Sequence, residues 1–322
     1  MTSFRTWGHK ARSGVHNDPE LATRVGSIEL PNPIMTASGT SGHGAELEAY
    51  FPLEQLGAVV VKSLSAEPWP GNPAPRLHEA GEAMLNSVGL QGPGISAWLS
   101  DDLPPLQRAH ARVVVSIWGR TVEEYEKAAI ALCGAPSDIV AVEVNLSCPN
   151  LEGGKHLFAH STADTAAAIG AVSAALDRPV WAKLTAHVTN IVDIAEAAIA
   201  AGADAVTITN TMLAMAIDPE TRRPRLGGGG GGLSGAAIHP IAVRAIHDVH
   251  AALPEATIVG AGGVITGVDA VELLLAGASA VQVGTATFAN PRAPVRVLHE
   301  VSEWCTRHGV SAVHEIIGGL DG

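Results

Sequence analysis

Eight short apolar runs recur along the chain, and each is followed by a stretch with helical character. The runs are "IMTAS" (34–38), "AVVVKS" (58–63), "RVVVSIWG" (112–119), "VAVEVN" (140–145), "VWAKL" (180–184), "DAVTITN" (204–210), "TIVGAGG" (257–263) and "AVQVGT" (280–285). Apolar runs that alternate with helices are typical of strands buried on both faces of a parallel sheet. Eight of them predict an α/β protein with the (β/α)8 TIM-barrel fold, and a doubly wound sheet is the alternative architecture.

The stretches between the runs carry signals for helix ends. "TVEEYEKAAIALCG" (121–134) begins with a threonine suited to cap a helix, continues with acidic residues and closes at Gly134. "TNIVDIAEAAIAAGAD" (189–204) and "TGVDAVELLLAGAS" (266–279) show the same threonine start and glycine stop. Threonine favours the first position of a helix and glycine the position after its end, so these stretches are predicted crossover helices.

No linker and no shift in composition divides the chain. We therefore predict a single barrel domain over residues 21–322, preceded by a polar leader over residues 1–20. Two connections are long, 63–112 after the second strand and 210–257 after the sixth. Long insertions after barrel strands lie over the C-terminal mouth, where active sites of this fold are built.

Six consecutive glycines occupy residues 227–232 in the second long connection. The run satisfies G-x-G-x-x-G trivially, but it follows no predicted strand and opens no predicted helix, as a dinucleotide-binding fingerprint would. We therefore interpret it as a mobile loop.

Charge and cysteine content narrow the class of protein. The formal net charge of -12 argues against a nucleic-acid partner, because nucleic-acid binding relies on clustered Lys and Arg. Three cysteines, at 133, 148 and 305, favour a reducing compartment and argue against a disulfide framework or a Cys-ligated metal cluster within this chain. No stretch looks like a signal peptide or approaches the ~18 apolar residues of a membrane span. We expect a cytoplasmic protein that binds small molecules or other proteins, without a metal site or a membrane partner.

The predicted strands end in residues that would share one mouth of the barrel. These residues are Ser38 and Gly39, Lys62 and Ser63, Asn145, Lys183, Asn210 and Thr211, Gly262 and Gly263, and Gly284 and Thr285. The "GAGG" and "VGTA" that end strands seven and eight fit the phosphate site often found there, where glycine lets backbone N–H groups approach an anion. The alternative is that these glycines only make tight turns.

Lys62 and Lys183 end two apolar runs that offer no adjacent carboxylate. A bound anion or polar ligand is therefore the expected partner of each ammonium group. Lys183 would suit the pyrimidine edge of a flavin, where negative charge develops on reduction.

Amide side chains gather in the same predicted region. They are Asn86, Asn145, Asn150 and Asn210. Together they could surround a planar ring of alternating amides without adding charge, which suits a cyclic imide or a pyrimidine. Cys148 lies among them in "VNLSCPN", a turn with proline directly after the thiol. The thiol is either a reactive group at the centre of a substrate clamp or a small apolar filler.

A series of ordered motifs resembles the class 1 dihydroorotate dehydrogenases, which are FMN-containing (β/α)8 barrels. From about residue 24 onward they are "NPIMTASGT", "VVVKS", "GNPAPR", "MLNSVGLQGPG", "VNLSCPN", "WAKL", "ITNT", "GGLSG", "GAGGV" and "VGTA". The cysteine in "NLSCPN" resembles the base of class 1 enzymes, because the membrane-bound class 2 enzymes carry serine at that position. "AIDPETRRPRLGGGGGGLSG" is most similar to subclass 1B. Two positions depart from the family pattern, Trp118 at the end of the third strand and Ala159 after Phe158.

The resemblance implies flavin-dependent oxidation of (S)-dihydroorotate to orotate in de novo pyrimidine biosynthesis. Cys148 would be the base that takes the C5 proton while C6 delivers hydride to N5 of FMN, and Lys183 would be the second catalytic residue. Nearby cations would lower the thiol pKa from its ordinary value of about 8.5 toward neutrality. The implied orotate site contains Lys62, Asn86, Gly89, Leu90, Asn145, Asn150, Asn210 and Thr211. The implied FMN site contains Ala37, Ser38, Gly39, Lys62, Ser63, Asn145, Lys183, Gly235, Gly262, Gly263, Gly284 and Thr285.

The resemblance also implies partners. Subclass 1B enzymes work with a second subunit that holds FAD and a 2Fe-2S cluster and passes electrons to NAD, so we expect a homodimer with such a subunit. Two alternatives stay open: a related FMN barrel acting on another dihydropyrimidine, and a class 1A-like enzyme that uses fumarate. A tRNA-reducing flavin barrel should be basic, and a flavin-binding scaffold would leave Cys148 idle.

Overall fold

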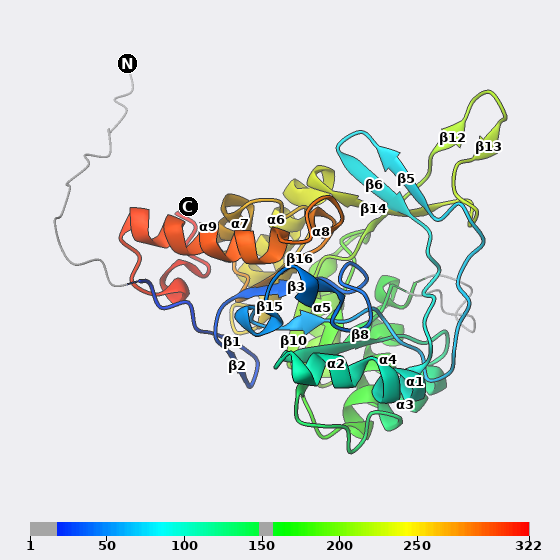
Figure 1. Ribbon diagram of the computed structural model, residues 1–322, viewed down its shortest axis with the longest axis horizontal. Helices are drawn as coiled ribbons and strands as arrows, with labels where there is room; N and C mark the ends of the chain where they lie inside the picture. Colours follow the sequence, from blue (N-terminus) through cyan, green and yellow to red (C-terminus); the bar gives the residue numbers. More distant parts are fainter. Residues whose placement is uncertain (1–17, 148–156, 322) are drawn as a thin grey trace.

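The structure is a computed structural model that describes residues 18–147 and 157–321. Eight parallel strands form one sheet in the order β3-β16-β15-β10-β9-β8-β7-β4. They are β3 (Ile34–Thr36), β4 (Val59–Val60), β7 (Val113–Ile117), β8 (Ile139–Asn145), β9 (Val180–Lys183), β10 (Ala205–Ile208), β15 (Ile258–Ala261) and β16 (Ala280–Val283). A parallel bridge between Met35 and Ala58 joins the two ends of this order, so the sheet closes and the predicted TIM barrel is confirmed (Figure 1).

Helices follow most of the strands, as the sequence predicts. The longer ones are α3 (Val122–Ile130), α4 (Thr162–Ala175), α5 (Ile191–Ala200), α6 (His239–Ala252), α7 (Gly267–Leu275) and α9 (Ala293–His308). The shorter ones are α1 (Ile95–Asp101), α2 (Leu103–Arg108) and α8 (Ala286–Ala289), with 3-10 turns η1 (Glu46–Ala49), η2 (Leu53–Gln55), η3 (Phe158–His160), η4 (Ala236–Ile238) and η5 (Val313–Ile316). Among the helices of the described chain, none is both long and apolar enough to cross a membrane.

The helix starts follow local capping chemistry. Thr121 Oγ1 accepts the Glu124 N–H at 3.2 Å at the start of α3, and Thr266 forms a reciprocal capping box with Asp269 at the start of α7. The predicted threonine start of α5 is wrong by one residue, because the side chain of Asn190 makes the cap by accepting the Val192 N–H at 3.1 Å. Asparagine is as good a cap as threonine, so the sequence offered two neighbouring candidates.

A small hairpin covers the N-terminal end of the barrel. It consists of β1 (Thr23–Val25) and β2 (Ile28–Leu30), which pair in antiparallel fashion. Val25 and Leu30 are buried in one apolar cluster with Met35 and Trp181, which fill the barrel interior. In the described part of the chain, packing closes this end of the barrel, and the cavity described below lies at the opposite, C-terminal end.

A second sheet covers the C-terminal end, and it is built from both long connections. Its four antiparallel strands, in the order β11-β14-β6-β5, are β11 (Met212–Ala214), β14 (Gly231–Gly235), β6 (Ala83–Asn86) and β5 (Leu77–Ala80). A hairpin of β12 (Ile217–Asp218) and β13 (Arg223–Pro224) extends beyond it. Figure 1 shows these strands on the far side of the barrel from the β1–β2 hairpin.

The interpretation of the glycine run as a mobile loop is wrong for its last two residues, which lie in β14. A Cβ on Gly231 would approach the carbonyl oxygen of Asn86 to 2.3 Å, and one on Gly232 would approach Oγ1 of Thr211 to 2.0 Å. Glycine is therefore required here because a neighbouring backbone or side chain leaves no room for a Cβ, rather than for mobility.

The two departures from the family pattern lie in packed regions. Trp118 is buried with an edge-to-face contact to Trp69, their ring centroids 5.8 Å apart. Ala159 is fully buried in η3, and its N–H donates to the carbonyl of Leu146 at 3.0 Å. Neither residue lines the cavity described below, so both act through the packing of neighbouring loops.

In the turn after β15, Gly263 is at a position where the structure leaves no room for a side chain. Gly263 has φ +71°, and a Cβ there would lie 2.8 Å from the backbone N and Cα of His239. Gly134 has φ +72° with nothing within 4 Å of the same point, so it is a matched control. We predict that Gly134→Ala lowers the free energy of unfolding by about 1–2 kcal/mol through its backbone conformation alone.

Gly263→Ala should lower the free energy of unfolding by about 1–3 kcal/mol more than Gly134→Ala, because the added methyl group also clashes with α6. Urea unfolding of the two variants and the parent protein measures the difference. Equal losses would mean that α6 moves aside at little cost.

Candidate active site

A cavity of about 840 Å³ opens at the C-terminal ends of the barrel strands. The strand ends form its floor, and the four-stranded sheet contributes to its wall through Met84, Asn86 and Leu213 among others. Pockets for cofactors and other small molecules usually have volumes of roughly 300–1,000 Å³. Both long connections therefore contribute to the mouth, as predicted.

Every predicted site residue that the structure describes lines this cavity. These residues are Ala37, Ser38, Gly39, Lys62, Ser63, Asn86, Gly89, Leu90, Asn145, Lys183, Asn210, Thr211, Gly235, Gly262, Gly263, Gly284 and Thr285. The two remaining ones, Cys148 and Asn150, lie outside the described residues. On either side of that gap, Ser147 and Leu157 also line the cavity.

Lys183 has a carboxylate partner, so the expectation that none is adjacent is wrong. Its Nζ lies 3.3 Å from Oε1 of Glu143 and donates to Oε1 of Gln282 at 2.8 Å. Glu143 is completely buried, and its Oε2 accepts from Nε2 of Gln282 at 2.6 Å and from Oγ1 of Thr207 at 3.0 Å. The carboxylate comes from the neighbouring strand β8, in which residues 142–145 pair with residues 180–183 of β9.

This network sets what Lys183 can offer to a ligand. A buried carboxylate and a buried ammonium group each lose much of their hydration, and they offset that loss by pairing and by hydrogen bonds to the remaining polar atoms. Among the described residues, Glu143 and Gln282 take two of the three N–H donors of Lys183. The third remains for a ligand on the cavity floor.

Two predicted amides meet directly. Asn210 Nδ2 donates to Oδ1 of Asn145 at 3.0 Å, and Asn145 Nδ2 donates to Oγ of Ser63 at 3.2 Å. The Tyr125 hydroxyl donates to the Asn145 carbonyl at 2.7 Å and fixes the backbone at the end of β8. Asn86 reaches the cavity from β6, where its Nδ2 donates to the Gly232 carbonyl at 3.3 Å. The structure thus brings Asn86, Asn145 and Asn210 to one cavity, as the hypothesis of an amide-lined ring site requires.

Lys62 brings positive charge to another part of the cavity wall. The backbone N–H of Lys62 donates to the Gly42 carbonyl at 3.0 Å, which places Lys62 beside His43, the residue after Gly42. Burial of the ring, and then the positive charge of Lys62, lower the pKa of His43. His43 therefore favours its neutral form near neutral pH, and the cation at this position is Lys62.

One end of the cavity fits a phosphate group. Gly262, Gly263, Gly284 and Thr285 line it there after β15 and β16, and their loops bring backbone N–H groups and a hydroxyl. Arg296 of α9 also lines the cavity. Glycine backbone, a hydroxyl and a guanidinium group suit an anion, while Lys183 and the amides suit a polar ring. The residues present therefore fit FMN, the cofactor implied by the resemblance.

Three contributors to the site escaped the sequence analysis. Glu143 and Gln282 lie inside the predicted strands "VAVEVN" and "AVQVGT", where a polar residue in an apolar run is the signal that could have identified them. Arg296 had no such signal. Its Nη2 donates to the Ile265 carbonyl at 2.7 Å and its Nη1 pairs with Glu300 at 2.8 Å, so only the tertiary fold brings it to the cavity.

Comparison with known proteins supports the assignment that the site suggests. The family model described as "Dihydroorotate dehydrogenase" matches residues 20–304. This chain belongs to the dihydroorotate dehydrogenase family. The resemblance seen in the sequence motifs is thereby confirmed.

Curated relatives match the chain over nearly its whole length. A protein of Alkaliphilus oremlandii is 46% identical over 300 residues, covering 93% of this chain and 98% of its own. Proteins of Desulforudis audaxviator and Trichlorobacter lovleyi are 46% and 41% identical, covering 93% and 94% of this chain and 97% and 99% of their own. All three are named dihydroorotate dehydrogenase B (NAD(+)), catalytic subunit, which agrees with the predicted subclass 1B.

The buried ion pair gives a prediction about stability. Glu143→Gln leaves the Lys183 ammonium group without its carboxylate, so the free energy of unfolding should fall by about 3–5 kcal/mol. The double variant Glu143→Gln/Lys183→Met removes both charges and should recover part of that loss. Urea unfolding of flavin-free protein measures both values without a contribution from ligand binding.

The exposed pair Lys127–Glu67, at 2.8 Å, is the matched control. Glu67→Gln should change the free energy of unfolding by less than about 1 kcal/mol, because solvent screens that pair. If the double variant is no more stable than Glu143→Gln alone, the loss does not come from an uncompensated charge.

Proposed function

We propose that this protein oxidises (S)-dihydroorotate to orotate in pyrimidine biosynthesis, with FMN as its cofactor. One observation supports this most directly: a single cavity joins a buried Lys183 on its floor, amides on its wall and glycine-rich loops at one end. Lys183 suits the negative charge that develops on a flavin during reduction, the amides suit the ring of a pyrimidine substrate, and the glycine-rich loops suit the flavin phosphate. The full-length match to the family points to the same reaction.

The residues that would hold FMN form groups that contact different parts of the cofactor. Gly262, Gly263, Gly284 and Thr285 would hold the phosphate, while Lys183 and Asn145 would meet the ring. The remaining proposed contacts are Ala37, Ser38, Gly39, Lys62, Ser63 and Gly235. When bound, FMN supplies the acceptor for the hydride that leaves C6 of dihydroorotate. Lys183 would stabilise the negative charge that builds up at the cavity floor during that transfer.

The substrate would lie against the amides. Asn86, Asn145, Asn150 and Asn210 would read its ring N–H and C=O groups, because an amide offers both a donor and an acceptor. Lys62 would pair with the substrate carboxylate. Gly89, Leu90 and Thr211 would complete this part of the site, all of them in the cavity wall. Leu90 has φ +62°, an unusual backbone conformation for a residue with a side chain and one often found at functional positions.

Cys148 would be the base. Its thiolate would take the proton from C5 as the hydride leaves C6, and the C5–C6 double bond of orotate would form from the released electron pair. This role is proposed from the family motif "NLSCPN" and from the position of Ser147 in the cavity wall directly before it.

Flavin bleaching tests the reaction and the base together. The purified protein should contain one FMN per chain and lose its yellow colour when mixed with dihydroorotate without oxygen. Cys148→Ser should bind FMN normally and reduce it about 10²-fold or more slowly near neutral pH, the usual scale for general-base catalysis. Part of the rate should return at high pH, because serine is the weaker base.

Cys133 offers the matched control, since it is free and exposed, with its thiol donating to the Ala175 carbonyl at 3.1 Å. Cys133→Ser should bleach at the parental rate. A Cys148→Ser variant that also bleaches at the parental rate would make the thiol structural. A folded protein that cannot be loaded with FMN would refute the proposed function.

A separate subunit would pass the electrons to NAD. This chain has three cysteines, too few for a four-thiolate cluster, and its only G-x-G-x-x-G lies in a glycine run that leads into β14 rather than between a strand and a helix. The relatives named above are each called a catalytic subunit, which supports a second subunit. We propose that it carries FAD and a 2Fe-2S cluster, that the catalytic chain forms a homodimer, and that the complex is cytoplasmic, where thiols stay reduced.

Electron transfer to NAD should therefore require that subunit. The isolated chain should oxidise dihydroorotate with a dye or oxygen as acceptor and should leave NAD unreduced. Added electron-transfer subunit should switch on NADH formation, followed by absorbance. Efficient NAD reduction by the chain alone would contradict this proposal, and fast turnover with fumarate would favour a class 1A-like enzyme.

A further inference from the structure

The loop that follows β15 is held from behind by a histidine. Gly262 and Gly263 at its start line the cavity, while His239, the first residue of α6, does not. The ring Nδ1 of His239 lies 2.9 Å from the Gly262 carbonyl oxygen, which can only accept a hydrogen bond. The ring therefore donates to this carbonyl from the side facing away from the cavity.

That bond orients the donor next to it. The carbonyl of Gly262 and the N–H of Gly263 belong to one planar trans peptide unit and point in opposite directions. Because His239 holds the carbonyl toward α6, the Gly263 N–H is turned to the other side, toward the cavity. The histidine thus aims a backbone donor at the end of the cavity that fits a phosphate.

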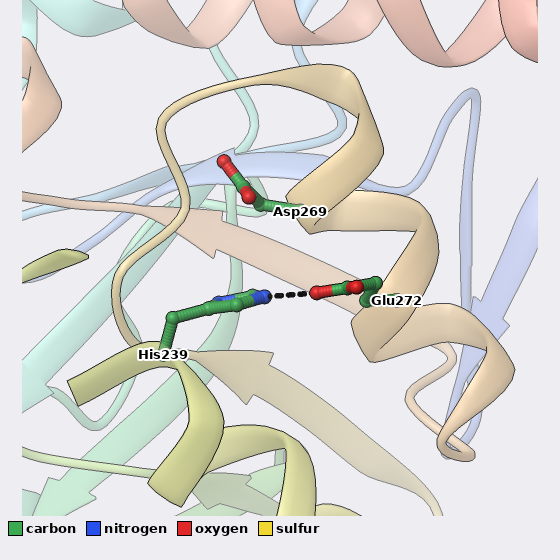
Figure 2. Close-up of side chains that lie close together, drawn as sticks. All are labelled: His239, Asp269 and Glu272. Atoms are coloured by element: carbon green, nitrogen blue, oxygen red, sulfur yellow. Dashed lines mark hydrogen bonds and ion pairs between the residues drawn. The ribbon is translucent and has the colours of Figure 1, made fainter. Parts of the chain in front are cut away.

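A carboxylate holds the other side of the ring. Nε2 of His239 lies 2.8 Å from Oε2 of Glu272 on α7, and Figure 2 shows the two side chains end to end. An ionised carboxylate also only accepts, so Nε2 donates to Glu272 when that nitrogen carries a proton. His239 is 9% exposed, so its side chain lies largely buried behind the Gly262–Gly263 peptide.

The contacts of His239, Glu272 and the nearby Asp269 do not favour a metal site. His239, Asp269 and Glu272 have potential ligand atoms within 4.8 Å of one another. However, Oδ2 of Asp269 accepts the N–H groups of Ile265 at 2.9 Å and Thr266 at 2.7 Å, and both ring nitrogens of His239 are engaged as described. Figure 2 shows Asp269 at the start of α7, apart from the histidine–glutamate contact. The three side chains serve the loop over residues 262–266.

We propose that the His239–Glu272 pair sets the affinity of the cavity for a phosphate monoester, by holding the Gly262 carbonyl and so aiming the Gly263 N–H at the ligand. The inference rests on the proposed function, in which this end of the cavity holds the phosphate of FMN. Arg296 fixes the far part of the loop through the Ile265 carbonyl, at 2.7 Å, so the loop is held independently at both ends. His239 is a positioning residue, because it acts on the ligand through the backbone of Gly263.

FMN and riboflavin, which differ by the phosphate alone, separate this role from a general structural one. The full-length protein is freed of flavin, and binding of each flavin is followed by the change in its fluorescence. His239→Leu should weaken FMN binding about tenfold or more, the scale of a lost hydrogen bond to a charged phosphate, and change riboflavin binding less than about twofold. Glu272→Gln, at a half-exposed position, keeps the ring and should give a smaller loss of the same kind.

Arg244 provides the control on the same helix, in an exposed pair with Asp248 at 2.7 Å. Arg244→Gln should bind both flavins like the parent protein. If His239→Leu folds poorly, Glu272→Gln decides. An unchanged preference for FMN over riboflavin, or equal losses for both flavins, would overturn the inference while leaving the proposed function intact. A parent protein that binds neither flavin would overturn both.

Discussion

A carboxylate and an ammonium group face each other inside this barrel, and the polar half of its interior depends on that pair. Removing either partner would leave a buried charge uncompensated, at a cost of several kcal/mol, so neither Glu143 nor Lys183 is tolerable alone. Gln282 and Thr207 both donate to the other oxygen of the carboxylate, Oε2. The four side chains come from β8, β9, β10 and β16, so the network ties both sides of the barrel together beneath the cavity. The floor on which a ligand would rest is therefore both charged and rigid.

The division of the barrel into two halves follows from the same constraint. Below the ion pair, Met35, Trp181 and their neighbours pack against the β1–β2 hairpin without polar partners. Above it, strand ends present amides, hydroxyls and glycine backbone to the cavity. Stability is supplied by the closed end and chemistry by the open one, as in other barrels of this kind.

Much of this could be predicted because the signals are local. Strands such as β4 and β15 are buried along their whole length, so each shows as an unbroken apolar run, and the residues at their ends follow from the parallel order. The Thr121 and Thr266 caps are equally local. Contacts between strands are not. Glu143 stands out as a polar residue in an apolar run, but its pairing with Lys183 depends on a contact between two strands. Arg296 reaches the cavity from α9, and the residues around it give no such signal. The glycines at the start of β14 were predicted to be a mobile loop for the same reason. They are needed because Asn86 and Thr211, which lie outside the glycine run, leave no room for a Cβ.

The sheet over the mouth has a consequence for how the site is assembled during synthesis. Asn86 of β6 and Gly232 of β14 are neighbours in that sheet, yet they are 146 residues apart in the chain. At a translation rate of about 5–20 residues per second, β6 waits roughly 7–30 seconds before its partner leaves the ribosome. During that interval the β5–β6 hairpin has an unpaired edge, and the barrel lacks β15 and β16, which follow β14. The cavity wall and the loops after β15 and β16 are thus completed long after the β5–β6 hairpin is made, and a cofactor can be enclosed only when residues up to the end of β16 have left the ribosome.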